Sequence, residues 1–306
     1  MNLKLNKSKL IYRKLEITDF KEFQNLFYLC FKRRISFEFF KWRYFSNNLS
    51  FCCGVFESSR LIANVGLISL KLNNNHHERI FSRHSSMVLK RYRGIGVFSD
   101  LLKKTRRDIL KNTQLIIMWP NKNNFANFSL STKEIVKKKF YLYQTTSRKT
   151  FLKKTKNYSI VQLLKFKKYI QCKDSFFFKN FLYFKNRYLS YNRGEYLINK
   201  YESKKNISFF IIKINKDNSG LSYVILDHFG SEKIRRKHLL ILIREQNNLI
   251  FLLKRKITKS NHKLLSDLNF NIGFIKKSRL KQKKKILNKK EIFLGDTDIF
   301  ITTKKI

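Results

Sequence analysis

The chain has 306 residues, enough for two domains of ordinary size, and 43% of them are apolar, which excludes a wholly disordered protein. Its formal net charge is +47, from 67 basic and 20 acidic residues, and such a balance favours a polyanionic partner. The chain is also rich in Lys, Asn, Ile, Phe and Tyr, which an AT-rich genome encodes readily, so codon drift is the competing explanation of the charge.

Neither a signal peptide nor a transmembrane helix is expected, because no apolar stretch reaches the length of either. The four cysteines and six histidines show no metal-ligand spacing, and Cys52 and Cys53 are adjacent. We therefore expect neither a metal site nor a disulfide framework. Together these features predict a cytoplasmic protein.

The first 145 residues predict α+β structure in which strands and helices alternate with short connections. Two helices are expected near the start, one after Asp19 and one capped by Ser36, because apolar residues follow each at helical spacing. A third helix is expected from Val97. Strands are expected at Leu10–Ile17, Cys52–Phe56, Leu61–Leu72, Ile80–Leu89, Leu115–Trp119 and Phe140–Thr145, with a polar break at 73–77.

The second half repeats the order of the first. The run Phe40-Lys41-Trp42-Arg43-Tyr44 recurs 144 residues later as Phe184-Lys185-Asn186-Arg187-Tyr188. The matching elements that follow are a hairpin, a strand over Leu221–Asp227, a helix over Ser231–Arg244 and a short strand over Leu249–Leu253. We therefore predict two domains of one fold, at 1–150 and 151–306.

The stretch MVLKRYRGIGVFSDLLKK, starting at Met87, joins a predicted strand to a predicted helix through a basic turn with two glycines. Gly94 and Gly96 let the backbone curl so that successive N–H groups point into one space, and the helix start adds unpaired N–H groups and partial positive charge. Arg91 and Arg93 add full charges. An anion cradle is predicted, with a plain turn as the alternative; neither a dinucleotide fingerprint nor a P-loop is present.

At these residues the sequence resembles the GNAT superfamily of acyl-CoA-dependent N-acetyltransferases. The run Arg91-Tyr92-Arg93-Gly94-Ile95-Gly96 is similar to that family's acetyl-CoA loop, Gln/Arg-x-x-Gly-x-Gly/Ala, with Lys90 in place of the usual proline. The resemblance implies two tandem GNAT-like domains, each a mixed, mostly antiparallel sheet flanked by helices. The first would be the acetyl-CoA-binding catalytic domain, and the second a degenerate copy that completes the acceptor cleft.

The resemblance also implies which residues hold acetyl-CoA as the co-substrate. Amides of the loop would bind the pyrophosphate, and the strand before the loop would offer free backbone groups to the pantetheine arm and to the thioester carbonyl. Asn121 follows the next strand, where family members often contact the cofactor. The implied cofactor-binding residues are Met87, Val88, Leu89, Arg91, Tyr92, Arg93, Gly94, Ile95, Gly96, Val97 and Asn121.

Acyl transfer to an amine needs a base, and the family often uses a carboxylate or a histidine on the strand before the loop. This sequence offers His84 there, so His84 is the candidate catalytic residue, with a structural histidine as the alternative. The family's usual acid is a tyrosine after the next strand, but Phe128 stands at the corresponding place. Tyr141 or Tyr143 is the candidate substitute, and protonation of the thiolate by solvent is the alternative.

In the second half, Leu226–Ser231 stands where the loop would be, with one glycine, no arginine and an acid, so we predict that it does not bind coenzyme A. The resemblance implies an N-acetyltransferase acting on the amine of a small molecule, with an amino sugar, free or nucleotide-linked, as the suggested acceptor. The alternatives are an aminoacyl-tRNA-dependent transferase of the tandem GNAT-like type and a non-catalytic basic RNA-binding module. A nucleic-acid partner stays open on charge alone, and membrane insertion is not expected.

Overall fold

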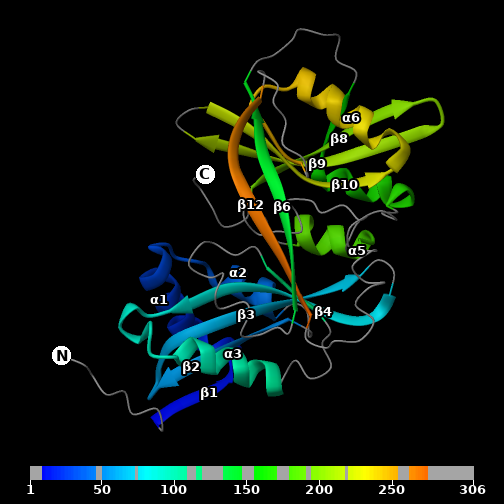
Figure 1. Ribbon diagram of the computed structural model, residues 1–306. Coiled ribbons are helices and arrows are strands. Elements are labelled where there is room, and N and C mark those ends of the chain that lie inside the picture. The colour runs from blue at the N-terminus through cyan, green and yellow to red at the C-terminus, as the bar shows by residue number, and fades with distance from the viewer. Residues whose placement is uncertain are drawn as a thin grey trace. The chain divides into compact units, whose positions relative to one another are not determined.

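The computed structural model describes residues 9–45, 50–72, 75–108, 115–118, 134–146, 155–170, 179–190, 194–217, 220–253 and 262–274. The chain divides into two compact units, and neither is a continuous segment (Figure 1). Unit 1 comprises 1–71, 77–137 and 271–280, and unit 2 comprises 72–76, 138–270 and 281–306. Strands β6 (Glu134–Thr145) and β12 (His262–Phe274) therefore contain residues of both units, and so, by one or two residues, do β3 (Arg60–Leu72) and β4 (Asn75–Val88), which meet at 72–76.

Unit 1 is a mixed sheet with helices packed against it. Its strands lie in the order β1 (Leu10–Lys14), β2 (Phe51–Glu57), β3 (Arg60–Leu72), β4 (Asn75–Val88), β5 (Leu115–Met118) and β12. β2 is antiparallel to β1 and β3, β4 is parallel to β5, and β12 is antiparallel to β5. Helices α1 (Phe20–Phe31), α2 (Phe37–Tyr44) and α3 (Val97–Asp108) share one apolar core with β2 and β3.

The local sequence explains where α1 and α2 begin and end. The α1 residues Phe23, Leu26 and Phe27 are buried, and their spacing of three and four places them on one helical face. Lys32 ends α1 in the left-handed conformation, with φ 56°. The Ser36 hydroxyl then accepts a hydrogen bond of 3.1 Å from the N–H of Phe39, as expected of a helix cap.

Unit 2 is also a mixed sheet, with the strand order β6, β11 (Leu249–Leu253), β10 (Gly220–Gly230), β9 (Asn206–Asp217), β8 (Glu195–Ser203) and β7 (Lys156–Ser159). Alternate residues of β9 face two cores. Phe209 packs in the core with the 3₁₀ helix Ile160–Tyr169 and α5 (Phe181–Phe184), whereas Phe210 packs in the core with α6 (Glu232–Glu245). Helices thus cover both faces of this sheet, as Figure 1 shows for α5 and α6.

The two units are copies of one fold, which confirms the repeat that the sequence predicts. In each unit a parallel strand pair is joined by a helix: β4, α3 and β5 in unit 1, and β10, α6 and β11 in unit 2. The hydroxyl of Tyr44 lies 2.6 Å from Ser85 Oγ on β4, and the hydroxyl of Tyr188 donates to Asp227 Oδ2 on β10 at 2.5 Å. The repeated tyrosines therefore make corresponding contacts.

The structure corrects three details of the sequence interpretation. The polar break was predicted at 73–77, but β4 already begins at Asn75. β6 begins at Glu134 rather than near Phe140. β12 was not predicted, although Leu268, Phe270, Ile272 and Phe274 alternate along it as strand residues do. Pairing with neighbouring strands, rather than apolar content, decides where these strands begin.

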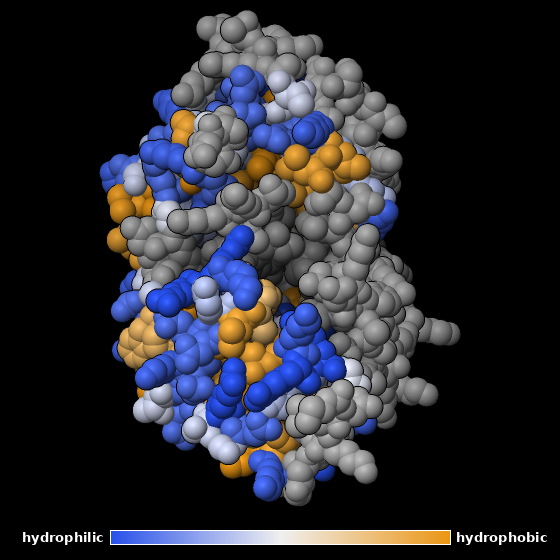
Figure 2. Space-filling view, turned by 90° about the vertical axis from the view of Figure 1, so that its left-hand side faces the viewer, coloured by the Kyte–Doolittle hydropathy of each residue, from blue (hydrophilic) through white to orange (hydrophobic). Residues whose placement is uncertain are grey.

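The exposed surface is of mixed character. On the face shown in Figure 2, hydrophilic and apolar side chains lie among one another. Single apolar residues are exposed in both units, such as Ile11 in unit 1 and Val161 in unit 2, which is normal for a folded protein. Among the described residues, no helix is both long enough and apolar enough to cross a membrane.

Two glycines of unit 2 allow the cost of backbone strain to be measured apart from the cost of steric crowding. Gly220 and Gly230 both have positive φ, 112° and 92°, but an added Cβ meets nothing within 4 Å at Gly220 and lies 2.6 Å from the backbone oxygen of Ile207 at Gly230. We expect Gly220→Ala to lower the free energy of unfolding by about 1 kcal/mol and Gly230→Ala by about 3 kcal/mol. Urea unfolding measures both, and equal losses would contradict the crowding.

Candidate functional site

The candidate site is the connection between β4 and α3 in unit 1. β4 pairs in parallel with β5 at Ile80–Ser82, and β4 then continues to Val88. The N–H of Leu89 bonds to Ile62 O on β3 at 3.0 Å, and a 3₁₀ turn follows at Lys90–Tyr92. The residues from Arg93 to Gly96 are exposed and lead directly into α3.

The two glycines of this loop adopt a backbone conformation that other residues rarely reach. Gly94 has φ 81° and Gly96 has φ 87°. A Cβ added at Gly94 would meet nothing within 4 Å, so the loop backbone faces open space there. Glycine at both positions therefore permits the curled path and leaves the backbone open to a ligand.

The start of α3 supplies hydrogen-bond donors to the same space. The N–H of Asp100 donates to Gly96 O at 2.9 Å and closes the first turn. The amides of Val97, Phe98 and Ser99 precede that bond, so they have no intrahelical acceptor, and the helix dipole makes this end positive. Asp100 itself adds an acidic side chain to the first turn, which opposes an anion. The backbone is thus the main source of attraction.

A three-residue cluster fixes the first part of the loop. The Tyr92 hydroxyl donates to Glu57 Oε2 at the end of β2, and Arg91 Nη2 donates to the Tyr92 hydroxyl at 2.6 Å. Arg91 also lies 3.2 Å from Glu57 Oε2 and stacks over the Tyr92 ring. Burial and the bond to Glu57 raise the pKa of Tyr92. Arg91 is therefore held by the protein itself, which lowers the charge it can offer to a ligand.

The implied cofactor-binding residues divide into exposed and buried ones. The side chains of Met87, Leu89, Tyr92 and Val97 are buried in the core of unit 1, so only their backbone groups can reach a ligand. Arg93 is exposed, and its Nε donates to Val88 O at 3.1 Å. Ile95 is 40% exposed.

The candidate base, His84, lies on β4 beside an irregularity of the strand. Its neighbour Ser85 has φ 45°, an unusual value for a residue other than glycine. The Tyr44 hydroxyl lies 2.6 Å from Ser85 Oγ, and Asn64 Nδ2 donates to Ser85 O at 3.0 Å. Burial raises the pKa of Tyr44 above its ordinary range. His84 itself is half-buried, so the strand holds it where solvent or an acceptor can reach it.

The residue before the candidate base on β4 is a buried arginine. Arg83 is almost fully buried, and burial lowers its pKa to about 10.

The functional roles of the loop and of His84 stay predictions. Sequence reasoning gave no role to Tyr44 and Asn64, which bond to Ser85 on β4. The repeat of Tyr44 as Tyr188 was the signal that could have found the first. Asn121 and Phe128 lie outside the described residues. Tyr143 is buried in unit 2 against the ring of Phe251, 5.9 Å away, which suits packing rather than proton donation.

Comparison with known proteins gives the fold a name. No family model and no curated protein matches the sequence. The solved structures that are similar to it include a GCN5-related N-acetyltransferase from Anabaena variabilis (8% identity, TM-score 0.64), a probable N-acyltransferase from Enterococcus faecalis (13%, 0.63) and Eis1 from Mycobacterium abscessus (9%, 0.56). Each match covers 87% of this chain and 73% of the other chain. The chain thus has the GNAT fold, in two GNAT-like domains.

Tyr92→Phe tests how the loop is held. Removing the hydroxyl ends the bonds to Glu57 and Arg91, so we expect the free energy of unfolding to fall by about 1 kcal/mol. Amide hydrogen exchange over 89–97 should become faster. Tyr12→Phe, at a half-buried tyrosine of β1, is the matched control. Equal exchange in both variants would contradict the role given to this cluster.

Proposed function

We propose that this chain, which has the fold of the GCN5-related N-acetyltransferases, transfers an acetyl group from acetyl-CoA to the amine of a small molecule. One observation carries the proposal: the Arg93–Gly96 loop opens its backbone to solvent between β4 and α3. That loop stands at a helix start, where N–H groups and the helix dipole suit a phosphate. Acetyl-CoA brings both the phosphates and the activated acetyl thioester.

The loop and the end of β4 are proposed to bind different parts of acetyl-CoA. The amides from Gly94 to Val97 bind the pyrophosphate, because the N–H of Arg93 already donates to Lys90 O at 3.2 Å. The backbone at the end of β4 binds the pantetheine arm. A main-chain N–H there donates to the thioester carbonyl and stabilises the charge that develops on its oxygen. Asn121 remains part of the proposed cofactor site. Binding through amides rather than side chains is compatible with the burial of Leu89, Tyr92 and Val97.

His84 is the proposed base. An ammonium group has no lone pair for attack on a carbonyl, so one proton must leave the acceptor. His84 accepts that proton, directly or through water. As the C–N bond forms, the C–S bond breaks and the sulfur leaves as a thiolate, which takes a proton from solvent in the absence of an assigned acid.

The acceptor is proposed to be an amino sugar, free or nucleotide-linked, in keeping with the basic composition of the chain. The degenerate second domain is proposed to complete the acceptor cleft without binding coenzyme A. There β10 leads through Gly230 straight into α6, and a Cβ at Gly230 would strike the backbone of Ile207. That crowding supports a second domain without a cofactor loop.

Acetyl-CoA binding is tested with two matched glycine variants. Gly94→Glu places a side chain and a negative charge where the phosphate is expected, whereas Gly220→Glu makes the same change at another glycine with positive φ and open surroundings. By isothermal titration we expect Gly94→Glu to weaken binding about 100-fold or more, corresponding to about 2.8 kcal/mol, and Gly220→Glu to leave it unchanged.

Equal affinities in the two variants, or no binding by the unaltered chain, would reject the loop as the donor site. RNA that purifies with the chain, together with no acetyl-CoA binding, would instead favour the tRNA-dependent or RNA-binding alternative.

His84→Gln tests the base. With an amine found by screening for the release of free thiol, we expect kcat to fall about 100-fold or more while acetyl-CoA affinity is retained. The acid limb of the pH–rate profile should disappear, because protonation of His84 causes it. His76→Gln, at the start of β4, is the control. An unchanged pH profile in His84→Gln would assign the base elsewhere.

A further inference from the structure

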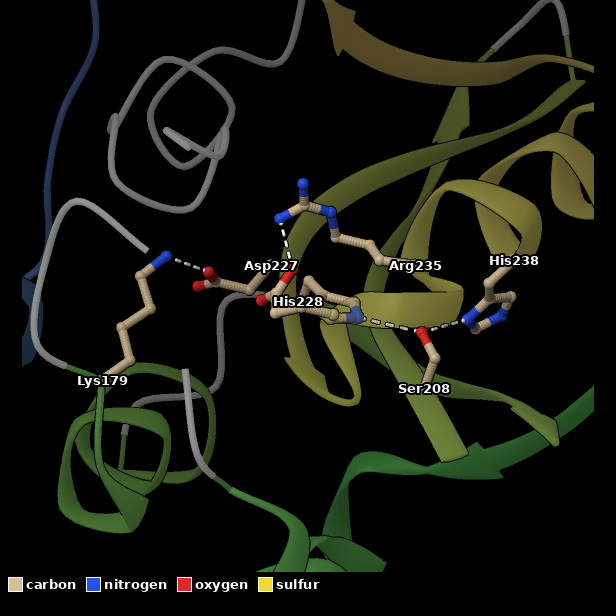
Figure 3. A network of polar contacts seen from close by, with 7 residues as sticks. Lys179, Ser208, Asp227, His228, Arg235 and His238 are labelled. Carbon is tan, nitrogen blue, oxygen red and sulfur yellow. Dashed lines mark hydrogen bonds and ion pairs between the residues drawn. The ribbon is translucent and has the colours of Figure 1, made fainter. Parts of the chain in front are cut away.

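A buried array of polar side chains in unit 2 has no part in the proposed reaction. Its centre is Ser208 on β9, whose Oγ lies 2.9 Å from His228 Nε2 on β10 and 2.9 Å from His238 Nδ1 on α6. Figure 3 shows the two imidazoles on either side of Ser208. All three residues are buried, so the array joins two strands and a helix away from solvent.

The outer contacts of the array fix its hydrogens. His228 Nδ1 lies 3.3 Å from Glu232 Oε1, an ion-pair contact rather than a hydrogen bond, and the negative charge of the carboxylate favours the hydrogen of the ring on this nitrogen. His238 Nε2 lies 2.7 Å from Asn199 Oδ1, an acceptor because the amide nitrogen of Asn199 already donates to Thr155 and Asn157. His238 Nε2 therefore carries a hydrogen as well.

These assignments leave the centre short of one hydrogen. A neutral imidazole has one N–H, so both nitrogens that face Ser208 are acceptors, and the hydroxyl has one hydrogen to give. A single added proton on His228 Nε2 completes the chain of bonds: His228 donates to Ser208, and Ser208 donates to His238. A second proton, on His238 Nδ1, leaves the Ser208 hydrogen without an acceptor.

The surrounding charges treat the two histidines differently. Glu232 faces His228 and is ionised, because its contacts with His228 and Arg235 outweigh burial and lower its pKa. Lys179 and Asp227 on the same side form a buried ion pair with each other. His238 lies between the rings of Phe210 and Tyr201, at 4.7 and 5.6 Å.

A positive charge therefore costs more on His238 than on His228. Burial lowers the pKa of both histidines, and that of His238 falls to about 3. The contacts described for His238 include no carboxylate, and a charged His228 would oppose its protonation further.

The order Glu232, His228, Ser208 is that of a hydrolytic triad, but the array cannot act as one. Ser208 is fully buried, and a second imidazole occupies the other side of its hydroxyl. No substrate carbonyl can approach a hydroxyl in that position. The chemistry left to these residues is the uptake and release of protons.

We propose that the Ser208 array is an acid-sensitive latch that fastens α6 to the sheet of unit 2, and that protonation of His238 releases it. The first proton, on His228, is compatible with both hydrogen bonds to Ser208. The second proton, on His238, is not. Histidine in an unfolded chain has a pKa of about 6.5, so below that pH the open state binds more protons than the closed state. The stabilisation by His238 is complete above that pH and is lost progressively toward pH 3.

Hydrogen exchange of the full chain between pH 7.5 and 4, corrected for the intrinsic pH dependence of exchange, tests the latch. We expect α6 to lose protection on acidification before β8 and β9 do. His238→Gln keeps a donor for Asn199 but takes up no proton, so its α6 should stay protected, and proton uptake on opening should fall by about one. His84→Gln, which removes a histidine of unit 1 outside the array, is the matched control, and its α6 should still open on acidification.

Loss of α6 protection over the same pH range in His238→Gln as in the unaltered chain would overturn the proposal. If that variant does not fold, NMR titration of the histidine rings in the unaltered chain decides the question. The ring of His238 should stay neutral until α6 exchange rises, and a His238 ring that charges while α6 remains protected would equally overturn it.

Discussion

A tyrosine hydroxyl bonded to the strand before the connecting helix is the contact on which both domains depend. Tyr44 holds Ser85 on β4, and Tyr188 holds Asp227 on β10. Each bond ties a helical segment to an irregular strand: Ser85 has positive φ, and the register of β10 shifts between Ile225 and Asp227. In each case the buried tyrosine hydroxyl satisfies a polar side chain at the irregular part of the strand, the Ser85 hydroxyl or the Asp227 carboxylate.

The two domains use this shared framework in opposite ways. In the first, the strand leads to a loop whose two glycines leave the backbone exposed, with half-buried His84 just before it. In the second, the carboxylate of Asp227 is bonded by Tyr183, Tyr188 and Lys179, and the chain enters α6 at once. One copy keeps its polar backbone open for a ligand, whereas the other uses its polar groups to hold itself together.

Sequence reasoning found most helices and strands, the repeat and the loop, because each leaves a local signal, but it missed the 3₁₀ helix Ile160–Tyr169. The spacing of Phe23, Leu26 and Phe27 and the cap at Ser36 are examples. It could not find contacts made between residues far apart in the sequence, such as Asn64 with Ser85 or Ser208 with His238. Such contacts depend on which strands become neighbours, and composition does not encode that. The polar start of β4 shows the same limit, since strand pairing overrode a turn-like composition.

The path of β6 and β12 sets the order in which the chain can fold during synthesis. The partner of β5 includes Asn271–Phe274, so the sheet of unit 1 lacks that strand until more than 270 residues have been made. β6 comes from the middle of the chain but pairs with β11 in unit 2. Domains that are continuous in sequence can fold one after the other as they leave the ribosome. Here the sheet of unit 1 is completed only after the strands of unit 2 have been synthesised. Neither domain can therefore complete its fold before the other has been made.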